Sequence, residues 1–151
     1  MNIVIQKTHR CSLSVEDKLI SQIGKGLIVF VGVDQHDTHE IVDYMARKIS
    51  HLRLFKDEND KINKSVLDIG GDVMVVSNFT LNAVIGSGTR PSFSHSAPPD
   101  YANELYLELA EKFRQNGIKH VATGVFGAHM HLDTIIDGPF NIVLEKKAIT
   151  E

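Results

Sequence analysis

The sequence has little of what usually cross-links a small protein. It contains one cysteine, Cys11, among 151 residues, so no disulfide can form within the chain. A single thiol fits a reducing compartment. Cys11 lies between Arg10 and Ser12 on an expected strand, and no nucleophile signature surrounds it. We therefore expect Cys11 to pack in the interior rather than to act as a nucleophile.

Long apolar runs are also missing. No window approaches the roughly 20 apolar residues that cross a bilayer, and the apolar start at residues 3–5 is too short for a secretion signal. We therefore expect a soluble, cytoplasmic protein without a membrane partner. Excess positive charge is absent too, because 16 Lys and Arg stand against 19 Asp and Glu, a formal net charge of −3. This argues against a broad nucleic-acid surface but allows contact with one end of an RNA.

The common catalytic signatures are absent as well. The chain has no G-x-S-x-G, H-E-x-x-H, Walker A or G-x-G-x-x-G motif. Its hydrophobic content of 42% is enough for a core without disulfides or metal. Composition and spacing alone therefore indicate an α/β domain and no particular reaction.

Hydrophobic periodicity predicts about nine strands and two long helices. The first helix is capped by Asp37 or Thr38, and the second begins near Asp100 and stops at Gly117. Asp137-Gly138 predicts a turn between the last two strands. The strands are expected near residues 3–7, 12–15, 19–23, 27–33, 52–55, 73–77, 118–124, 128–135 and 140–147.

Two helices cannot cover both faces of so much sheet. We therefore predict an α/β fold in one domain over residues 1–151, a β-β-α layered sandwich. In this arrangement two sheets pack together and both long helices lie on one outer face. Residues 82–99 form a loop too long to be a plain connector, which favours a functional role.

The first candidate site lies where the strand at 73–77 ends, in Ser77, Asn78, Phe79 and Thr80. Strand ends in mixed sheets often present polar groups to a crevice. The backbone N–H groups of Phe79 and Thr80 could bind a developing oxyanion. An ordinary Ser/Thr turn is the alternative interpretation.

Two further segments are weaker candidates on their own. Arg90 could contact a phosphate or a carboxylate, and Phe93 could stack on a base. A hairpin tip at Asp137-Gly138-Pro139 could reach a neighbouring subunit, or it could be a plain tight turn.

The histidines raise the question of a metal. His36 and His39 lie in the expected capping turn, where exposed polar residues are ordinary. His129 and His131 share one face of a strand but have no third ligand nearby in the sequence. We therefore expect no metal site.

Taken together, these segments resemble the D-aminoacyl-tRNA deacylase family over nearly the whole chain. Their order and spacing, rather than any single motif, carry the resemblance. The matching segments are Gly24–Leu27, Tyr44–Ile49, Leu52–Phe55, Leu67–Gly71, Val75–Leu81, Arg90–Phe93, Ala97–Pro99, Thr123–Met130 and Asp137–Pro139.

The resemblance implies hydrolysis of the ester that joins a D-amino acid, or glycine, to the 3′ end of a tRNA, without a cofactor. It also implies a homodimer with active sites at the subunit interface. Gly138-Pro139, with a cis bond, would enter the partner's pocket, where its carbonyls would block an L side chain. The other substrate-binding residues that the resemblance implies are Asp137, Phe126, Met130, Arg90 and Phe93.

In the same family a Ser-Gln-x-x-Thr segment corresponds to Ser77 through Thr80. Its backbone N–H groups would hold the oxyanion, and such a donor is typically worth ~3–4 kcal/mol. Thr80 has been viewed there as a nucleophile, but no base accompanies it in this motif. We therefore expect Thr80 to bind substrate while the terminal ribose 2′-OH helps to activate water.

The chain departs from the family pattern around the site. Asn78 stands where the family has Gln, and Ile136 and Asn141 replace the Asn and Thr that flank Gly138-Pro139. Residues 84–89 lack the basic residues that commonly precede Arg90, which weakens the expected grip on phosphates. The open alternatives are an ordinary deacylase, a relative that hydrolyses another aminoacyl or acyl ester, a non-catalytic binder of an aminoacyl-nucleotide or nucleic-acid end, and a metal-binding protein that uses the histidines.

Overall fold

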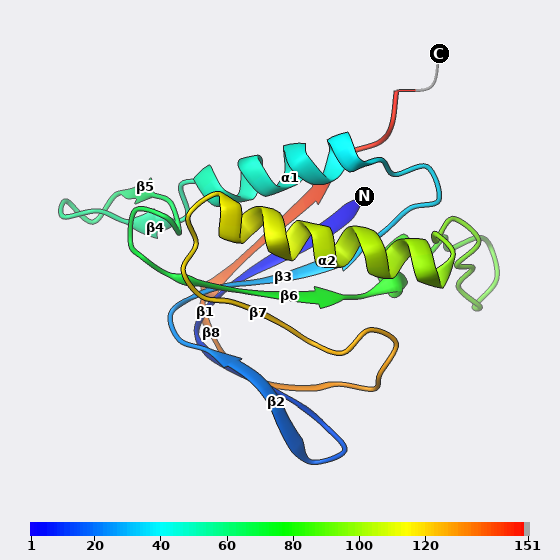
Figure 1. Cartoon of the computed structure of the whole chain (residues 1–151), viewed down its shortest axis with the longest axis horizontal. Coiled ribbons are helices and arrows are strands. Elements are labelled where there is room, and N and C mark those ends of the chain that lie inside the picture. Colours follow the sequence, from blue (N-terminus) through cyan, green and yellow to red (C-terminus); the bar gives the residue numbers. More distant parts are fainter. Residues whose placement is uncertain (150–151) are drawn as a thin grey trace.

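A computed structural model describes residues 1–149 (Figure 1). The predicted domain extends to Glu151, and its last two residues lie outside the described part. The elements in chain order are β1 (Asn2–Val15), β2 (Lys18–Ile23), β3 (Gly26–Gly32), α1 (His39–His51), β4 (Phe55–Lys56), β5 (Ile62–Lys64), β6 (Asp72–Ser77), the 3-10 helix η1 (Phe79–Asn82), α2 (Pro99–Gln115), β7 (Val121–Thr123) and β8 (His131–Glu145).

Three parallel strands form one half of the main sheet. The strand order is β2-β1-β3-β6-β7, and β6 runs parallel to both β3 and β7. The chain passes through α1 between β3 and β6, and through α2 between β6 and β7. Both connections step in the same direction along the sheet, so both helices cover the same face (Figure 1).

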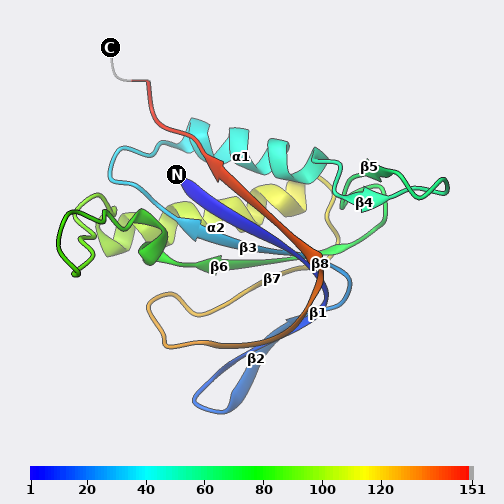
Figure 2. The same cartoon turned by 180° about the vertical axis from the view of Figure 1, so that it is seen from behind.

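A second β layer covers the opposite face of the parallel strands (Figure 2). It consists of the second half of β1, the first half of β8, and β2. Both layers belong to one hydrogen-bonded sheet because β1 pairs with β2, β3 and β8. The predicted β-β-α layering is confirmed, with a large core under the helices and a smaller core between the β layers. Cys11 is fully buried in the smaller core, as predicted, and burial raises the pKa of its thiol.

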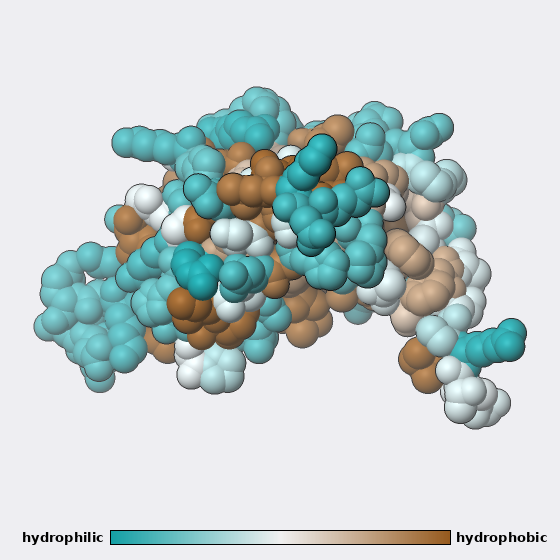
Figure 3. All heavy atoms as spheres, turned by 90° about the horizontal axis from the view of Figure 1, so that it is seen from below, coloured by the Kyte–Doolittle hydropathy of each residue, from teal (hydrophilic) through white to brown (hydrophobic). Residues whose placement is uncertain are grey.

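Strand boundaries differ from those predicted in two respects. The strands expected at 3–7 and 12–15 are one strand, β1, and those expected at 128–135 and 140–147 are joined in the single strand β8, which covers only residues 131–145 of them. The strand expected at 52–55 is reduced to β4, which pairs with the unpredicted β5. This two-stranded hairpin projects as an almost wholly hydrophilic lobe, at the left of Figure 3.

The predicted turn at Asp137-Gly138 is wrong. These residues lie inside β8, where the pairing jumps from Thr8 opposite Ile136 to Gln6 opposite Asn141. Residues 137–140 therefore form a bulge opposite a single residue of β1. The Gly138–Pro139 peptide bond is cis, as the resemblance implied.

The helix ends follow local capping chemistry. The Thr38 hydroxyl accepts from the Ile41 N–H at 3.4 Å and caps α1. Asp37, the other predicted cap, instead accepts from the Asp34 N–H at 2.7 Å. Gly117 follows α2 with φ of +108°, which confirms the predicted stop. Neither α1 nor α2, the long helices of residues 1–149, combines the length and apolar character of a bilayer span.

Candidate active site

A cavity opens where the parallel strands β3, β6 and β7 end. In α/β sheets ligands usually bind at these carboxyl ends. The cavity has a volume of about 940 Å³. Its apolar wall includes Phe30, Val33, Val76, Phe126, Met130 and Leu132, and its polar groups include Ser77, Asn78, Thr80, Ser96 and His129.

The predicted catalytic segment forms one side of this cavity. Ser77, Asn78, Phe79 and Thr80 all line it. The Asn78 N–H donates to the Val31 carbonyl at 2.8 Å, where β6 leaves the sheet. The Asn78 side chain then caps η1, since its Oδ1 accepts from the Thr80 N–H at 3.3 Å and from the Thr80 hydroxyl. This cap bends the chain at the cavity wall.

The hydrogen bonds of this turn leave one backbone donor unused. The Thr80 N–H is bonded to Asn78, and the N–H groups of Leu81 and Ala83 donate to the carbonyls of Asn78 and Thr80. Within the described residues, the Phe79 N–H has no acceptor. A free N–H beside a cavity suits a developing oxyanion. Of the two N–H groups predicted for this role, only that of Phe79 is free.

Phe93 reaches the cavity from the long loop. Its ring meets that of Phe79 edge-on, with centroids 4.9 Å apart and an interplanar angle of 74°. Reciprocal backbone hydrogen bonds of 2.8 and 3.0 Å between Val84 and Ser92 hold this loop as a small hairpin. Arg90, at the same hairpin, is exposed and does not line the cavity. The structure thus brings Phe93 to the catalytic segment and leaves Arg90 outside.

Phe126 and Met130 enter the cavity from the segment between β7 and β8. Tyr106 of α2 supports Phe126, with ring centroids 6.0 Å apart, and its hydroxyl donates to the Gly124 carbonyl at 3.3 Å. Burial raises the pKa of Tyr106, which keeps this donor protonated. A Cβ at Gly124 would lie 2.5 Å from Met130 Sδ, so a larger residue there would displace the Met130 side chain in the cavity wall.

The bulge of β8 is separate from this wall. Gly138 and Pro139 are exposed and, like Asp137, do not line the cavity of their own chain. The Lys7 ammonium holds the base of the bulge, 3.9 Å from the Asp137 carboxylate and 5.3 Å from the centroid of the Phe140 ring. Gly138 has φ of +130°, and a Cβ there would lie 2.8 Å from the Phe140 nitrogen. The bulge therefore needs glycine at this position.

Similarity to known proteins covers almost the whole chain. A family model described as D-Tyr-tRNA(Tyr) deacylase matches residues 4–145. The chain belongs to this family. The D-aminoacyl-tRNA deacylase of Thermotoga petrophila is 45% identical over 149 residues, 99% of each chain. That of Clostridioides difficile is 46% identical over 145 residues, 96% of this chain and 97% of that one.

Two solved structures share the deacylase fold of this chain. The c-Myc DNA unwinding element binding protein has a TM-score of 0.92 at 37% identity and covers 98% of this chain and 100% of its own. A probable eukaryotic D-amino acid tRNA deacylase has a TM-score of 0.82 at 18% identity, covering 95% and 97%. Membership of a deacylase family makes this chain a hydrolase.

The histidines of this deacylase do not gather around a metal position. Among the described residues, no group of three His, Cys, Asp or Glu side chains could hold an ion. His129 is the one ionisable side chain among those that line the cavity, and its ring packs against His131 with centroids 5.0 Å apart. His39 instead bonds to Glu108 of α2 at 2.5 Å, which raises the pKa of the imidazole.

Several residues of the site gave no signal in the sequence. Ser96 lines the cavity, and the buried Asn82 donates to its hydroxyl at 3.4 Å. Both lie in or next to the long loop, whose length was the only sign of a role. Pro98 and Pro99 lie at the start of α2 and also form part of the wall.

Proposed function

We propose that this deacylase hydrolyses the ester bond that joins a D-amino acid, or glycine, to the 3′ end of a tRNA. The products are the free amino acid and the tRNA, so the reaction removes wrong amino acids before translation uses them. Family membership and full-length relatives at 45% and 46% identity support this activity. The observation that carries the proposal is the unused N–H of Phe79, a residue that lines a largely apolar cavity.

In the proposed reaction, water attacks the ester carbonyl carbon and an electron pair moves onto the carbonyl oxygen. The Phe79 N–H donates to this oxyanion, and removing such a donor typically costs about 3–4 kcal/mol of transition-state stabilisation. The intermediate then collapses, the bond to the ribose 3′ oxygen breaks, and that oxygen takes up a proton. Ser77 and Asn78 shape the turn that presents the N–H.

Thr80 binds rather than attacks in this proposal. Its hydroxyl donates to Asn78 Oδ1, and an amide oxygen is too weak a base to activate it. The lining residues offer no carboxylate or lysine, and the ring of His129, their one ionisable side chain, packs against His131. In this proposal the terminal ribose 2′-OH of the substrate assists the attacking water.

A second copy of the chain is proposed to supply the selection of D over L amino acids. The Gly138–Pro139 bulge lies outside its own cavity. In the described residues β8 pairs only with β1, and on β8 Ile135 and Val143 are 47% and 76% exposed. A homodimer formed through β8 would bring the bulge, with Asp137 at its base, to the partner's cavity. There it would exclude an L side chain by steric conflict.

The remaining predicted residues complete the proposed substrate site. Phe126 and Met130 would surround the aminoacyl group, and Phe93 would contact the terminal nucleotide. Arg90, exposed beside the cavity loop, would meet a phosphate of the tRNA 3′ end. Because aminoacyl-tRNA is its substrate, the protein is proposed to act in the cytoplasm.

Single-turnover hydrolysis of D-Tyr-tRNA, Gly-tRNA and L-Tyr-tRNA by excess enzyme tests the proposal. We expect rapid loss of the D-tyrosyl or glycyl ester with the L-tyrosyl ester spared. Thr80→Val should slow the reaction without abolishing it, whereas a nucleophilic Thr80 would leave no enzymatic rate. If all three esters remain intact at high enzyme concentration, the proposed function is wrong.

Binding without hydrolysis is a second candidate. The structure with 37% identity is named for binding a DNA element, which favours a nucleic-acid end as ligand. A non-hydrolysable D-aminoacyl-adenosine analogue that binds, together with esters that stay intact, would identify this function. Intact tyrosyl and glycyl esters with turnover of another acyl ester would instead indicate a changed substrate.

A further inference from the structure

Asn82, the last residue of η1, is a polar side chain buried behind the active-site turn. Only 3% of it is exposed, so its amide requires partners inside the protein. The same short helix begins at Phe79, which carries the free N–H. Whatever holds Asn82 therefore fixes the far end of the segment that presents this donor.

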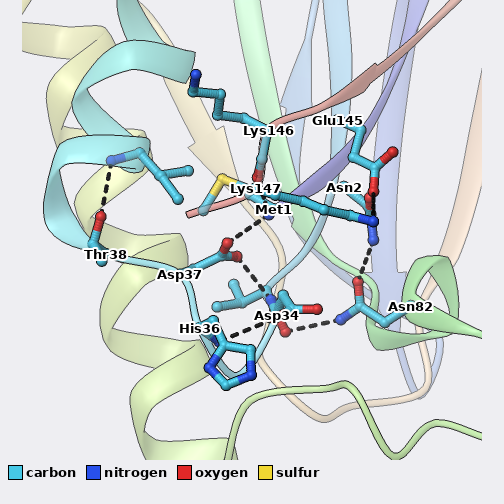
Figure 4. A network of polar contacts seen from close by, with 12 residues as sticks. Met1, Asn2, Asp34, His36, Asp37, Thr38, Asn82, Glu145, Lys146 and Lys147 are labelled. Atoms are coloured by element: carbon cyan, nitrogen blue, oxygen red, sulfur yellow. Dashed lines mark hydrogen bonds and ion pairs between the residues drawn. The ribbon is translucent and has the colours of Figure 1, made fainter. Parts of the chain in front are cut away.

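The Asn82 amide is bonded to three separate parts of the chain, and Figure 4 shows its bond to Asn2. Its Oδ1 accepts from Asn2 Nδ2 at 2.8 Å. Its Nδ2 donates to the Val33 carbonyl at 2.8 Å and to the Ser96 hydroxyl at 3.4 Å. Val33 and Ser96 both line the cavity, while Asn2 begins β1. Asn82 thus ties η1 to two parts of the cavity wall and to the central sheet.

The surroundings of this amide pair are closely fitted. A Cβ at Gly32 would lie 2.7 Å from Asn82 Oδ1, so the end of β3 leaves the space that the amide fills. Next to Asn2, the Met1 ammonium is buried and donates to Asp37 Oδ1 at 2.5 Å (Figure 4). Asn2 therefore approaches Asn82 from backbone that is itself held in place.

We propose that Asn82, oriented by Asn2, is a positioning residue that sets η1 so that the Phe79 N–H points at the ester carbonyl. This inference rests on the proposed hydrolysis at this turn. Asn82 is not among the residues that line the cavity, so its effect on the reaction passes through η1. Loss of its side chain leaves the Asn2 amide without a partner and the Val33 carbonyl with only the Ala97 N–H, and it frees η1 to shift.

The test compares Asn82→Ala with a matched control, Asn116→Ala. The Asn116 Nδ2 also donates one half-buried hydrogen bond, to Ser50 Oγ at 3.3 Å, at the end of α2 away from Pro99. In Asn82→Ala we expect the saturated single-turnover rate with D-Tyr-tRNA to fall at least tenfold. The enzyme concentration at half-maximal rate should change less than threefold, because substrate contacts remain. Asn116→Ala should keep the wild-type rate within twofold.

A double-mutant cycle tests the role of Asn2. Asn2→Ala removes one of the three bonds and should slow the reaction less than Asn82→Ala. The double variant should be no slower than Asn82→Ala alone, because Asn2 acts only through Asn82. If Asn82→Ala does not fold, Asn2→Ala carries the test with the same measurements. Multiplicative loss of rate in the double variant would overturn the coupling.

A measurement without substrate separates this inference from the proposed function. The backbone amide NMR resonances of Phe79 and Thr80 should shift in Asn82→Ala and stay in place in Asn116→Ala. Shifted resonances in a protein that hydrolyses none of the tRNA esters would support positioning by Asn82 while the proposed function fails. Unmoved resonances, or an equal loss of rate in both alanine variants, would overturn the role of Asn82.

Discussion

Replacing Asn78 with aspartate tests the oxyanion position without removing the cap of η1. Aspartate keeps the oxygen that accepts from the Thr80 N–H at 3.3 Å. Asp and Asn are about equally good N-caps, so the free energy of unfolding should change by less than about 0.5 kcal/mol. The variant therefore differs from the wild type mainly by one negative charge in the cavity wall.

The size of the effect follows from the distance between that charge and the oxyanion at the Phe79 N–H. At a separation of roughly 5 Å, Coulomb repulsion is about 3 kcal/mol at an effective dielectric constant of ~20, and under ~1 kcal/mol in bulk water. The wall is largely apolar, which keeps the effective dielectric constant well below that of water. We expect a loss of about 1.4–2.8 kcal/mol of transition-state stabilisation, a ten- to hundredfold slower reaction.

Single-turnover hydrolysis of D-Tyr-tRNA measures the rate of the reaction, and urea unfolding of the same preparations measures the free energy of unfolding. Asn78→Gln is the neutral control, and it also restores the residue that the family pattern carries. Its rate should stay within about threefold of the wild type, since it adds no charge. If Asn78→Asp folds normally and hydrolyses the ester at the wild-type rate, the oxyanion does not form at this turn.

Three further changes test other parts of the structure. Lys7→Met removes the cation beside the Phe140 ring, so the free energy of unfolding in urea should fall by about 1–3 kcal/mol; an unchanged midpoint would contradict this contact. Gly138→Ala places a side chain at φ of +130°, and it should weaken rejection of L-Tyr-tRNA more than it weakens folding; unchanged rejection would argue against the bulge as selector. His39→Gln removes an imidazole whose pKa the Glu108 hydrogen bond raises above 6.5. An imidazole whose pKa is raised by folding stabilises the folded protein at pH values below its pKa in the unfolded chain. This contribution is lost as the pH rises through its pKa in the folded protein. The melting temperature of the wild type should therefore fall from about pH 6 to 8, and that of the variant should not. Parallel profiles of the two proteins would refute this contribution of His39.

The layers of the fold could be predicted from local patterns. The apolar runs at 27–33 and 73–77 became parallel strands buried on both faces, because such strands need apolar side chains at successive positions. Leu105, Leu109 and Phe113, which recur at helical spacing in the sequence, form the buried face of α2. The place of Ser77 to Thr80 at the edge of the sheet could also be predicted, because polar residues directly after a buried strand mark such an edge. The catalytic role of this segment stays a prediction.

The bulge of β8 could not be predicted in this way. Asp137, Gly138 and Pro139 are turn-forming residues, and local chemistry alone predicts a hairpin. The long pairing of β8 with β1 on both sides keeps the strand continuous, so the extra residues leave the ladder as a bulge.

The sequence by itself determined the helix ends and the turn at Asn78, because each depends on neighbours a few residues away. It determined the layers through the number of strands that two helices must cover. Only the tertiary structure decided what meets at the cavity. Phe93, Phe126 and Thr80 come together through the order of strands β3, β6 and β7, and the Asn2–Asn82 contact joins residues 80 positions apart. No local periodicity encodes such contacts, since they arise only when distant elements pack against one another.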